Sequence, residues 1–70
     1  MEDYKKRMAL EYAYIKEKYN KLDKLLTKYE AKTLDFTFNC PVGLLYDQLG
    51  IMQRYLKILE VRAEIEDIVL

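Results

Sequence analysis

The sequence predicts an all-α fold in which two long helices form an antiparallel hairpin. Apolar residues recur at alternating spacings of three and four along two segments. The chain has only two Gly and one Pro, and it contains 51% hydrophobic and 34% charged residues, a composition typical of folded helical proteins. Seventy residues are enough for one small domain, which we expect to span residues 1–70.

The first helix is expected over residues 3–29, where no Gly or Pro interrupts the helical spacing. The apolar positions of this segment are Met8, Tyr12, Ile15, Tyr19, Leu22, Leu26 and Tyr29. Glu2 and Asp3 lie near its start, and Lys24 and Lys28 lie near its end. Both placements complement the helix dipole, which favours negative charge at the start and positive charge at the end.

Residues 30–40 are expected to form an extended strap. Leu34, Phe36 and Phe38 alternate there with polar residues, which is the two-residue period of an extended chain. A lone strand leaves its backbone groups unpaired. We therefore expect the strap either to pack its two Phe rings over the helices or to pair with another chain.

The second helix is expected over residues 42–67, with Pro41 in its first turn and Asn39 or Cys40 as the cap. Its apolar residues form two neighbouring rows, and an antiparallel first helix can cover only one of them. The other row is expected to bury against further copies of the chain, in a symmetric homo-oligomer. The interface residues expected in that row are Ile51, Tyr55, Ile58 and Ile65.

Several classes of function are excluded by composition. The absence of His and the single Cys exclude an intrachain disulfide, a Cys/His zinc site and a His-based triad. Without a Gly-rich phosphate loop, we expect no catalytic residue, no metal and no cofactor, and therefore no enzyme. No apolar run could span a membrane, and the balance of 12 basic and 12 acidic residues argues against DNA or RNA as a partner. A cytoplasmic location follows as an expectation.

A second row on the first helix mixes tyrosines with cations. Its members are Tyr4, Arg7, Glu11, Tyr14, Lys18, Lys21, Leu25 and Lys28. A Tyr ring can stack on a planar base while Lys or Arg neutralises phosphate, so the row could bind a nucleotide-like ligand. The alternative is that these charged side chains are only the solvated face of the helix.

The spacing along this row requires two chains for one ligand. Tyr4 and Lys18 are separated by about 21 Å along a helix, too far to grip one compact molecule. If the first helices of two copies run antiparallel across a two-fold axis, Tyr4 of one copy comes near Lys18 and Lys21 of the other. The groove between the copies would then suit a ligand with two-fold symmetry.

An ordered set of packing and polar positions spans nearly the whole chain. Its members are Tyr4, Arg7, Met8, Glu11, Ile15, Lys18, Lys21, Leu22, Leu34, Phe36, Pro41, Leu44, Leu45, Gln48, Leu49, Met52, Tyr55, Leu56, Leu59 and Arg62. This set resembles the small phage proteins of the crAss-like-phage-related family. That family in turn resembles the phage anti-CBASS sponges, helical hexamers that sequester cyclic oligonucleotide signals of bacterial immunity without cleaving them.

The resemblance implies a phage anti-defence sponge acting in the cytosol of the infected bacterium. It implies cyclic dinucleotide binding between paired protomers of a hexamer, with Tyr4 stacking on a base, Arg7 nearby, and Lys18 or Lys21 on phosphate. Met8 and Glu11 belong to the same implied site. Arg62 would serve a separate cyclic trinucleotide pocket where three protomers meet.

A second function of another class stays open. The surplus apolar row of the second helix could dock onto a different protein, which would make the chain a phage accessory interaction module with no small-molecule ligand.

Overall fold

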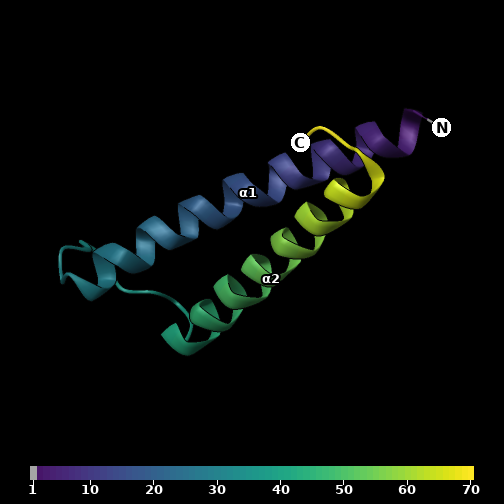
Figure 1. Cartoon of the computed structure of the whole chain (residues 1–70). Helices are drawn as coiled ribbons and strands as arrows, with labels where there is room; N and C mark the ends of the chain where they lie inside the picture. Colours follow the sequence, from purple (N-terminus) through teal and green to yellow (C-terminus); the bar gives the residue numbers. More distant parts are fainter. Residues whose placement is uncertain (1) are drawn as a thin grey trace.

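The computed structural model describes residues 2–70 and shows two antiparallel helices, α1 (Glu2–Glu30) and α2 (Val42–Glu66). Within that range there is no strand, and the predicted all-α hairpin is confirmed. The molecule is a rod of 46 × 18 × 16 Å. The two helices lie closest where the chain termini meet and diverge toward the connecting loop (Figure 1). Met1, which the expected domain also includes, lies outside the described residues.

Helix α1 is continuous and ends in a Schellman motif. The amide of Thr33 donates to the carbonyl of Lys28 at 2.9 Å, and the amide of Lys32 donates to that of Tyr29 at 3.1 Å. Lys32 has φ 62°, in the left-handed region that glycine adopts most easily. These bonds satisfy carbonyls that the end of a helix leaves unpaired.

Helix α2 begins without a side-chain cap, so the expected capping by Asn39 or Cys40 is wrong. Pro41 itself occupies the N-cap position, with φ −59° and ψ 133°, and no side chain accepts from the first-turn amides. The Leu44 amide donates instead to the Pro41 carbonyl at 3.0 Å. The helix therefore starts one residue later than a cap at Cys40 would require.

The segment between the helices, residues 31–41, is a loop and not a strand. Its rings pack together at the end of α1. The Phe38 ring lies 5.8 Å from that of Tyr29 and 5.7 Å from that of Phe36, measured between centroids, the latter pair edge to face. Phe38 is thereby half-buried, whereas Phe36 is exposed. Of the two expected uses of the strap, the structure shows packing over a helix.

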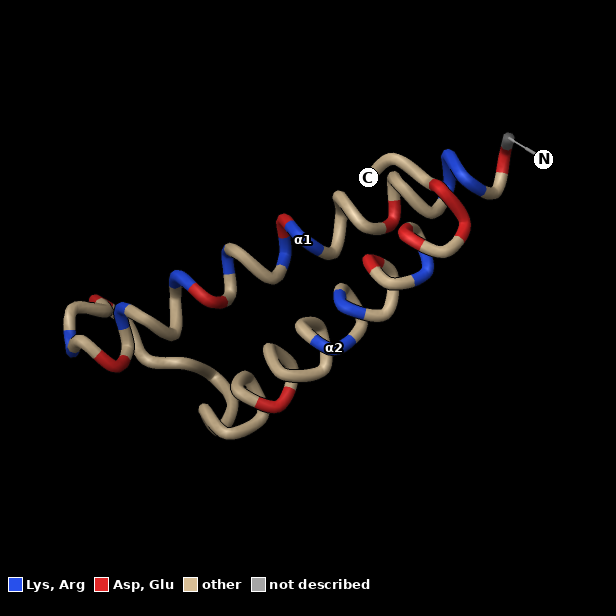
Figure 2. Tube along the Cα trace, in the orientation of Figure 1, with Lys and Arg blue, Asp and Glu red and all other residues tan. Residues whose placement is uncertain are grey.

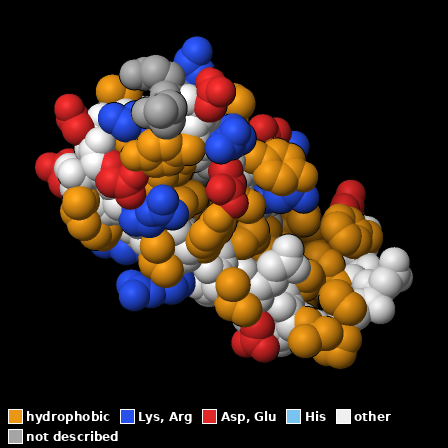
Figure 3. All heavy atoms as spheres, turned by 90° about the vertical axis from the view of Figure 1, so that its right-hand side faces the viewer, with side chains coloured by type: hydrophobic (Ala, Val, Ile, Leu, Met, Phe, Trp, Pro, Cys, Tyr) orange, Lys and Arg blue, Asp and Glu red, His pale blue; other side chains and the backbone are white. Residues whose placement is uncertain are grey.

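The core between the helices is thin. The buried side chains are Met8, Leu26, Met52, Leu56, Leu59 and Ala63. Many other hydrophobic side chains lie on the outside, and Figure 3 shows them over much of the visible surface, most densely in its lower right part. Such a surface is more apolar than a solitary small domain usually presents.

Charge is distributed unevenly along the hairpin. Figure 2 shows Lys and Arg along the length of α1. In α2 the acidic Asp47 lies near the start, and the Lys and Arg residues follow in the middle and toward the C-terminal end. No helix of the described chain is long and apolar enough to cross a membrane.

Because the core is thin, each buried leucine is expected to contribute much of the stability. Leu59 is 1% exposed, and Leu59→Ala should lower the free energy of unfolding by about 2–5 kcal/mol through lost burial and a cavity. Chemical denaturation followed by circular dichroism measures this change. Leu10→Ala is the matched control because Leu10 is 70% exposed; an equal loss in both variants would contradict the assignment of the core.

Candidate functional site

Four tyrosine hydroxyls of the hairpin donate hydrogen bonds to glutamates on the opposite helix. Two of the tyrosines belong to α1 and two to α2, so the bonds cross the hairpin in both directions. The pairs are Tyr4–Glu66 at 2.9 Å, Tyr12–Glu60 at 2.7 Å, Tyr46–Glu30 and Tyr55–Glu11. They flank the thin core and fix which face of each helix is turned outward.

These bonds shift the pKa values of the tyrosines upward. The glutamate that accepts from each hydroxyl favours its protonated form, and the effect raises the pKa of Tyr46 from 10 to about 12. Glu66, Glu60 and Glu11 raise the pKa values of Tyr4, Tyr12 and Tyr55 in the same direction, chiefly through the hydrogen bond. The bond from Tyr4 in turn lowers the pKa of Glu66, with further lowering by Arg62 against the effect of desolvation.

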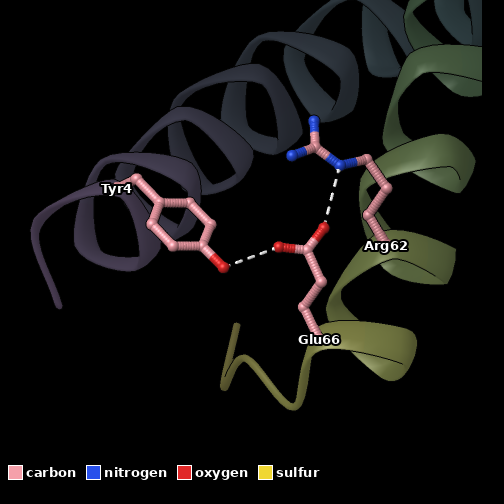
Figure 4. A network of polar contacts seen from close by, with 3 residues as sticks. All are labelled: Tyr4, Arg62 and Glu66. Carbon is pink, nitrogen blue, oxygen red and sulfur yellow. Dashed lines mark hydrogen bonds and ion pairs between the residues drawn. The ribbon is translucent and has the colours of Figure 1, made fainter. Parts of the chain in front are cut away.

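Tyr4, Glu66 and Arg62 form one polar network at the end of the hairpin (Figure 4). The Arg62 Nε lies 3.3 Å from Glu66 Oε2, and the Tyr4 hydroxyl bonds the other carboxylate oxygen. Among the side chains of residues 3–70, Arg62 makes its hydrogen bond to Glu66 through Nε, and its terminal guanidinium nitrogens make none. The structure thus brings together Tyr4 and Arg62, which the sequence assigned to two different ligand pockets.

The other predicted ligand residues differ in their environments. Arg7 is exposed, whereas Met8 is buried in the core and Glu11 accepts the bond from Tyr55. The Lys18 ammonium lies 4.9 Å from the centre of the Tyr14 ring. Lys21 pairs with Glu17 at 3.0 Å, but both side chains are largely exposed, so this ion pair is weak. Both lysines therefore retain surface on which a phosphate could compete.

The predicted interface residues lie on the outside of α2. Three isoleucines seven residues apart, with Leu44 one repeat earlier, form an apolar row that we call the outer stripe. Its members are Leu44, Ile51, Ile58 and Ile65, and all four are exposed, Ile51 at 70% and Ile65 at 77%. Tyr55, also predicted at the interface, is half-buried through its contact with Glu11.

The outer stripe and the predicted ligand row lie on the same side of the hairpin. Tyr55 and Arg62 belong to the same face of α2 as Ile51 and Ile58, because these positions are three or four residues apart. Tyr55 contacts Glu11 of the α1 row, and Arg62 reaches Tyr4 through Glu66. A partner docked on the stripe would therefore adjoin the predicted ligand residues.

A groove lined by residues of both helices was not predicted from the sequence. Its volume is about 560 Å³, and its lining includes Lys16 and Tyr19 of α1 with Gly50, Arg54 and Lys57 of α2. We call it the basic groove. The only sequence signal for it was Arg54 three residues before Lys57, which reads equally well as a solvated face.

Comparison with known protein families shows to which family this chain belongs. A family model described as Sequestin matches residues 2–65, most of the sequence. The chain belongs to the Sequestin family. The name denotes sequestration, which fits the binding without chemistry that the resemblance to phage sponges implies. No curated protein and no solved structure matches the chain.

The geometry of this Sequestin chain is suited to binding. Among residues 2–70, no group of three or more His, Cys, Asp or Glu is placed to hold a metal ion. Cys40 is exposed. The polar side chains that meet across the helices are tyrosine–glutamate pairs, which position rings and charges at the surface.

The raised tyrosine pKa values predict a loss of stability at alkaline pH. A group whose pKa is higher in the folded state stabilises the fold fully below its unfolded value and loses that effect as pH rises through the folded value. The contribution of Tyr46 should therefore decline from pH 10 to about 12. Tyrosinate absorbance, taken as the difference between the native chain and Tyr46→Phe, measures this titration.

The substitution Glu30→Gln tests whether Glu30 causes the raised pKa of Tyr46. It should move the Tyr46 midpoint back toward 10, because the amide lacks the negative charge that disfavours tyrosinate. Glu64→Gln, on an exposed glutamate outside the four pairs, should leave the midpoint in place. A titration midpoint of Tyr46 that is unchanged by Glu30→Gln would show that this pair does not form.

Proposed function

We propose that this protein sequesters a cyclic oligonucleotide signal in the seams between copies of the hairpin, without altering it chemically. Membership of the Sequestin family supports a sequestering role. The observation that carries the proposal is that the outer stripe adjoins the Tyr4–Glu66–Arg62 network on one side of the molecule. As implied by the resemblance to phage sponges, the signal belongs to bacterial immunity and its capture blunts the host defence.

A second copy is the occupant best matched to the outer stripe. A two-fold axis at the level of Ile58 would pack Ile58 on its own counterpart and Ile51 on Ile65 of the other copy, since these residues are equally spaced about it. The contact would bury three exposed isoleucines on each copy. A small domain with a thin core gains stability from such self-association.

The same axis organises the ligand row of α1. Tyr12 bonds Glu60, so the level of Ile58 passes α1 near Tyr12. Tyr4 lies eight residues before Tyr12. The two-fold axis would therefore place Tyr4 opposite the segment that lies eight residues after Tyr12 in the other copy, beside Lys21 and close to Lys18. A single two-fold arrangement therefore supports both the apolar contact and the Tyr4–lysine groove predicted from the sequence.

Each residue of the row would have a defined part in binding. The bond to Glu66 orients the Tyr4 ring, which is 38% exposed and can stack on a base. Phosphate would be neutralised by Arg7, Lys18 and Lys21. The terminal nitrogens of Arg62 would serve the separate cyclic trinucleotide pocket. Three such pairs of chains would make the hexamer that the resemblance implies.

Stacking by Tyr4 is tested by isothermal titration calorimetry with a panel of cyclic di- and trinucleotides. Tyr4→Leu should weaken binding about 5- to 150-fold, since base–aromatic stacking contributes about 1–3 kcal/mol. Tyr4→Phe keeps the ring, loses only the bond to Glu66, and should bind much closer to the native chain. No binding of any cyclic nucleotide by the intact assembly would refute the proposal and favour docking of the outer stripe onto another protein.

Assembly through the outer stripe is tested by light scattering. Ile58→Asp should lower the particle mass, because the two-fold contact would place two carboxylates against each other in an apolar interface. Leu10→Asp is the control, since Leu10 is as exposed as Ile51 but lies outside the stripe. A mass unchanged by Ile58→Asp would remove the stripe from the interface.

A further inference from the structure

The basic groove has the size and the charge of a ligand site within a single chain. Its volume of about 560 Å³ falls within the range of about 300–1,000 Å³ that small-molecule pockets occupy. Lys16, Arg54 and Lys57 line it from both helices, and none of the three forms an ion pair with another residue of the described chain. An anion entering the groove would therefore not have to break an ion pair of these cations.

The charges of the groove match a dianion. Glu60 also lines it, but its carboxylate already accepts the Tyr12 hydroxyl at 2.7 Å. Three cations and this one carboxylate give the groove a net charge of two positive units. A phosphate monoester carries a negative charge of about the same size. The half-buried Tyr19 supplies a ring on the same wall, against which a planar group can pack.

Gly50 provides the second observation. It lies within α2, where Gly is among the least favourable residues. A Cβ atom built on Gly50 meets nothing within 4 Å, so packing inside the chain does not require glycine there. Gly50 lines the basic groove, so a side chain added there would stand beside it. Glycine at this position therefore leaves room at the groove, although it disfavours the helix.

We propose that the basic groove, formed by Lys16, Tyr19, Gly50, Arg54 and Lys57, binds a small phosphate ester bearing a planar ring. The residues that line it are not those of the Tyr4–Glu66–Arg62 network or of the outer stripe, and the groove is complete in one chain. It therefore does not depend on the seam proposed for the cyclic oligonucleotide.

Two-dimensional amide NMR of the whole protein, titrated with AMP, tests this site. AMP should shift the amides of Gly50 and Lys57, and adenosine, which lacks the phosphate, should bind at least about tenfold more weakly. Inorganic phosphate should also bind more weakly than AMP, because it has no ring to pack on Tyr19. Equal binding of AMP and adenosine, or of AMP and phosphate, would overturn the assignment to a phosphate ester with a ring.

Matched variants separate the groove from general surface charge. Lys57→Gln should weaken AMP binding about tenfold, whereas Lys28→Gln, on an exposed lysine outside the groove, should not. Gly50→Leu should abolish binding by filling the groove, and Gly43→Leu should not, although its Cβ also meets nothing within 4 Å. Tyr4→Leu should leave AMP binding unchanged, which separates failure here from failure of the seam site.

Each of the following results would contradict the proposal. If Gly50→Leu binds AMP as tightly as the native chain, the groove is not the site. If it folds but lowers the particle mass with AMP binding intact, Gly50 serves a contact between copies. Should Gly50→Leu fail to fold, Lys57→Gln decides alone, and its undiminished binding would overturn the assignment.

Discussion

The tyrosine–glutamate hydrogen bonds that cross between α1 and α2 are the interaction on which the rest of the structure depends. Among the described residues six hydrophobic side chains are buried, and a core so thin leaves the rotation of each helix weakly specified. Bonds near both ends of the hairpin, such as Tyr4–Glu66 and Tyr46–Glu30, fix that rotation. Together with the apolar spacing that selects the buried residues, they orient the outward faces of the two helices.

Two surfaces of different chemistry result from this rotation. One side combines the outer stripe with the network around Glu66, where apolar contact between copies and nucleotide binding can share one seam. Other residues of the two helices line the basic groove, which one chain completes. Capture on either side requires tight binding and no reaction. A nanomolar dissociation constant corresponds to about −12 kcal/mol, within reach of stacking combined with charge-assisted contacts in a closed seam.

The sequence predicts the hairpin well because helical spacing is a local property. The positions from Met8 to Leu26 and the apolar rows after Pro41 predict both helices and their antiparallel packing. The start of α2 was harder to place, because proline can occupy either the cap or the first turn. The loop between the helices showed the alternation of a strand, but no neighbouring strand is present among the described residues to pair with it.

The sites are less predictable, because they depend on which residues face one another across the two helices. Spacing places Tyr4 and Glu11 on one face of α1, but it does not show that Glu66 and Tyr55 meet them. The basic groove depends in the same way on Lys16 lying opposite Arg54. Met8 illustrates the converse, since helical spacing alone places it in the core where the structure shows it. Contacts between distant segments require the relative rotation of the helices, which no local pattern contains.

Native mass spectrometry of the whole protein, with and without a cyclic dinucleotide, tests the central claim most directly. The account predicts an assembly with an even number of chains that gains up to two dinucleotides for every two chains, because the two-fold axis pairs Tyr4 of each copy with the lysines of the other and so completes two equivalent sites. A single chain at micromolar concentration that gains no nucleotide would contradict it.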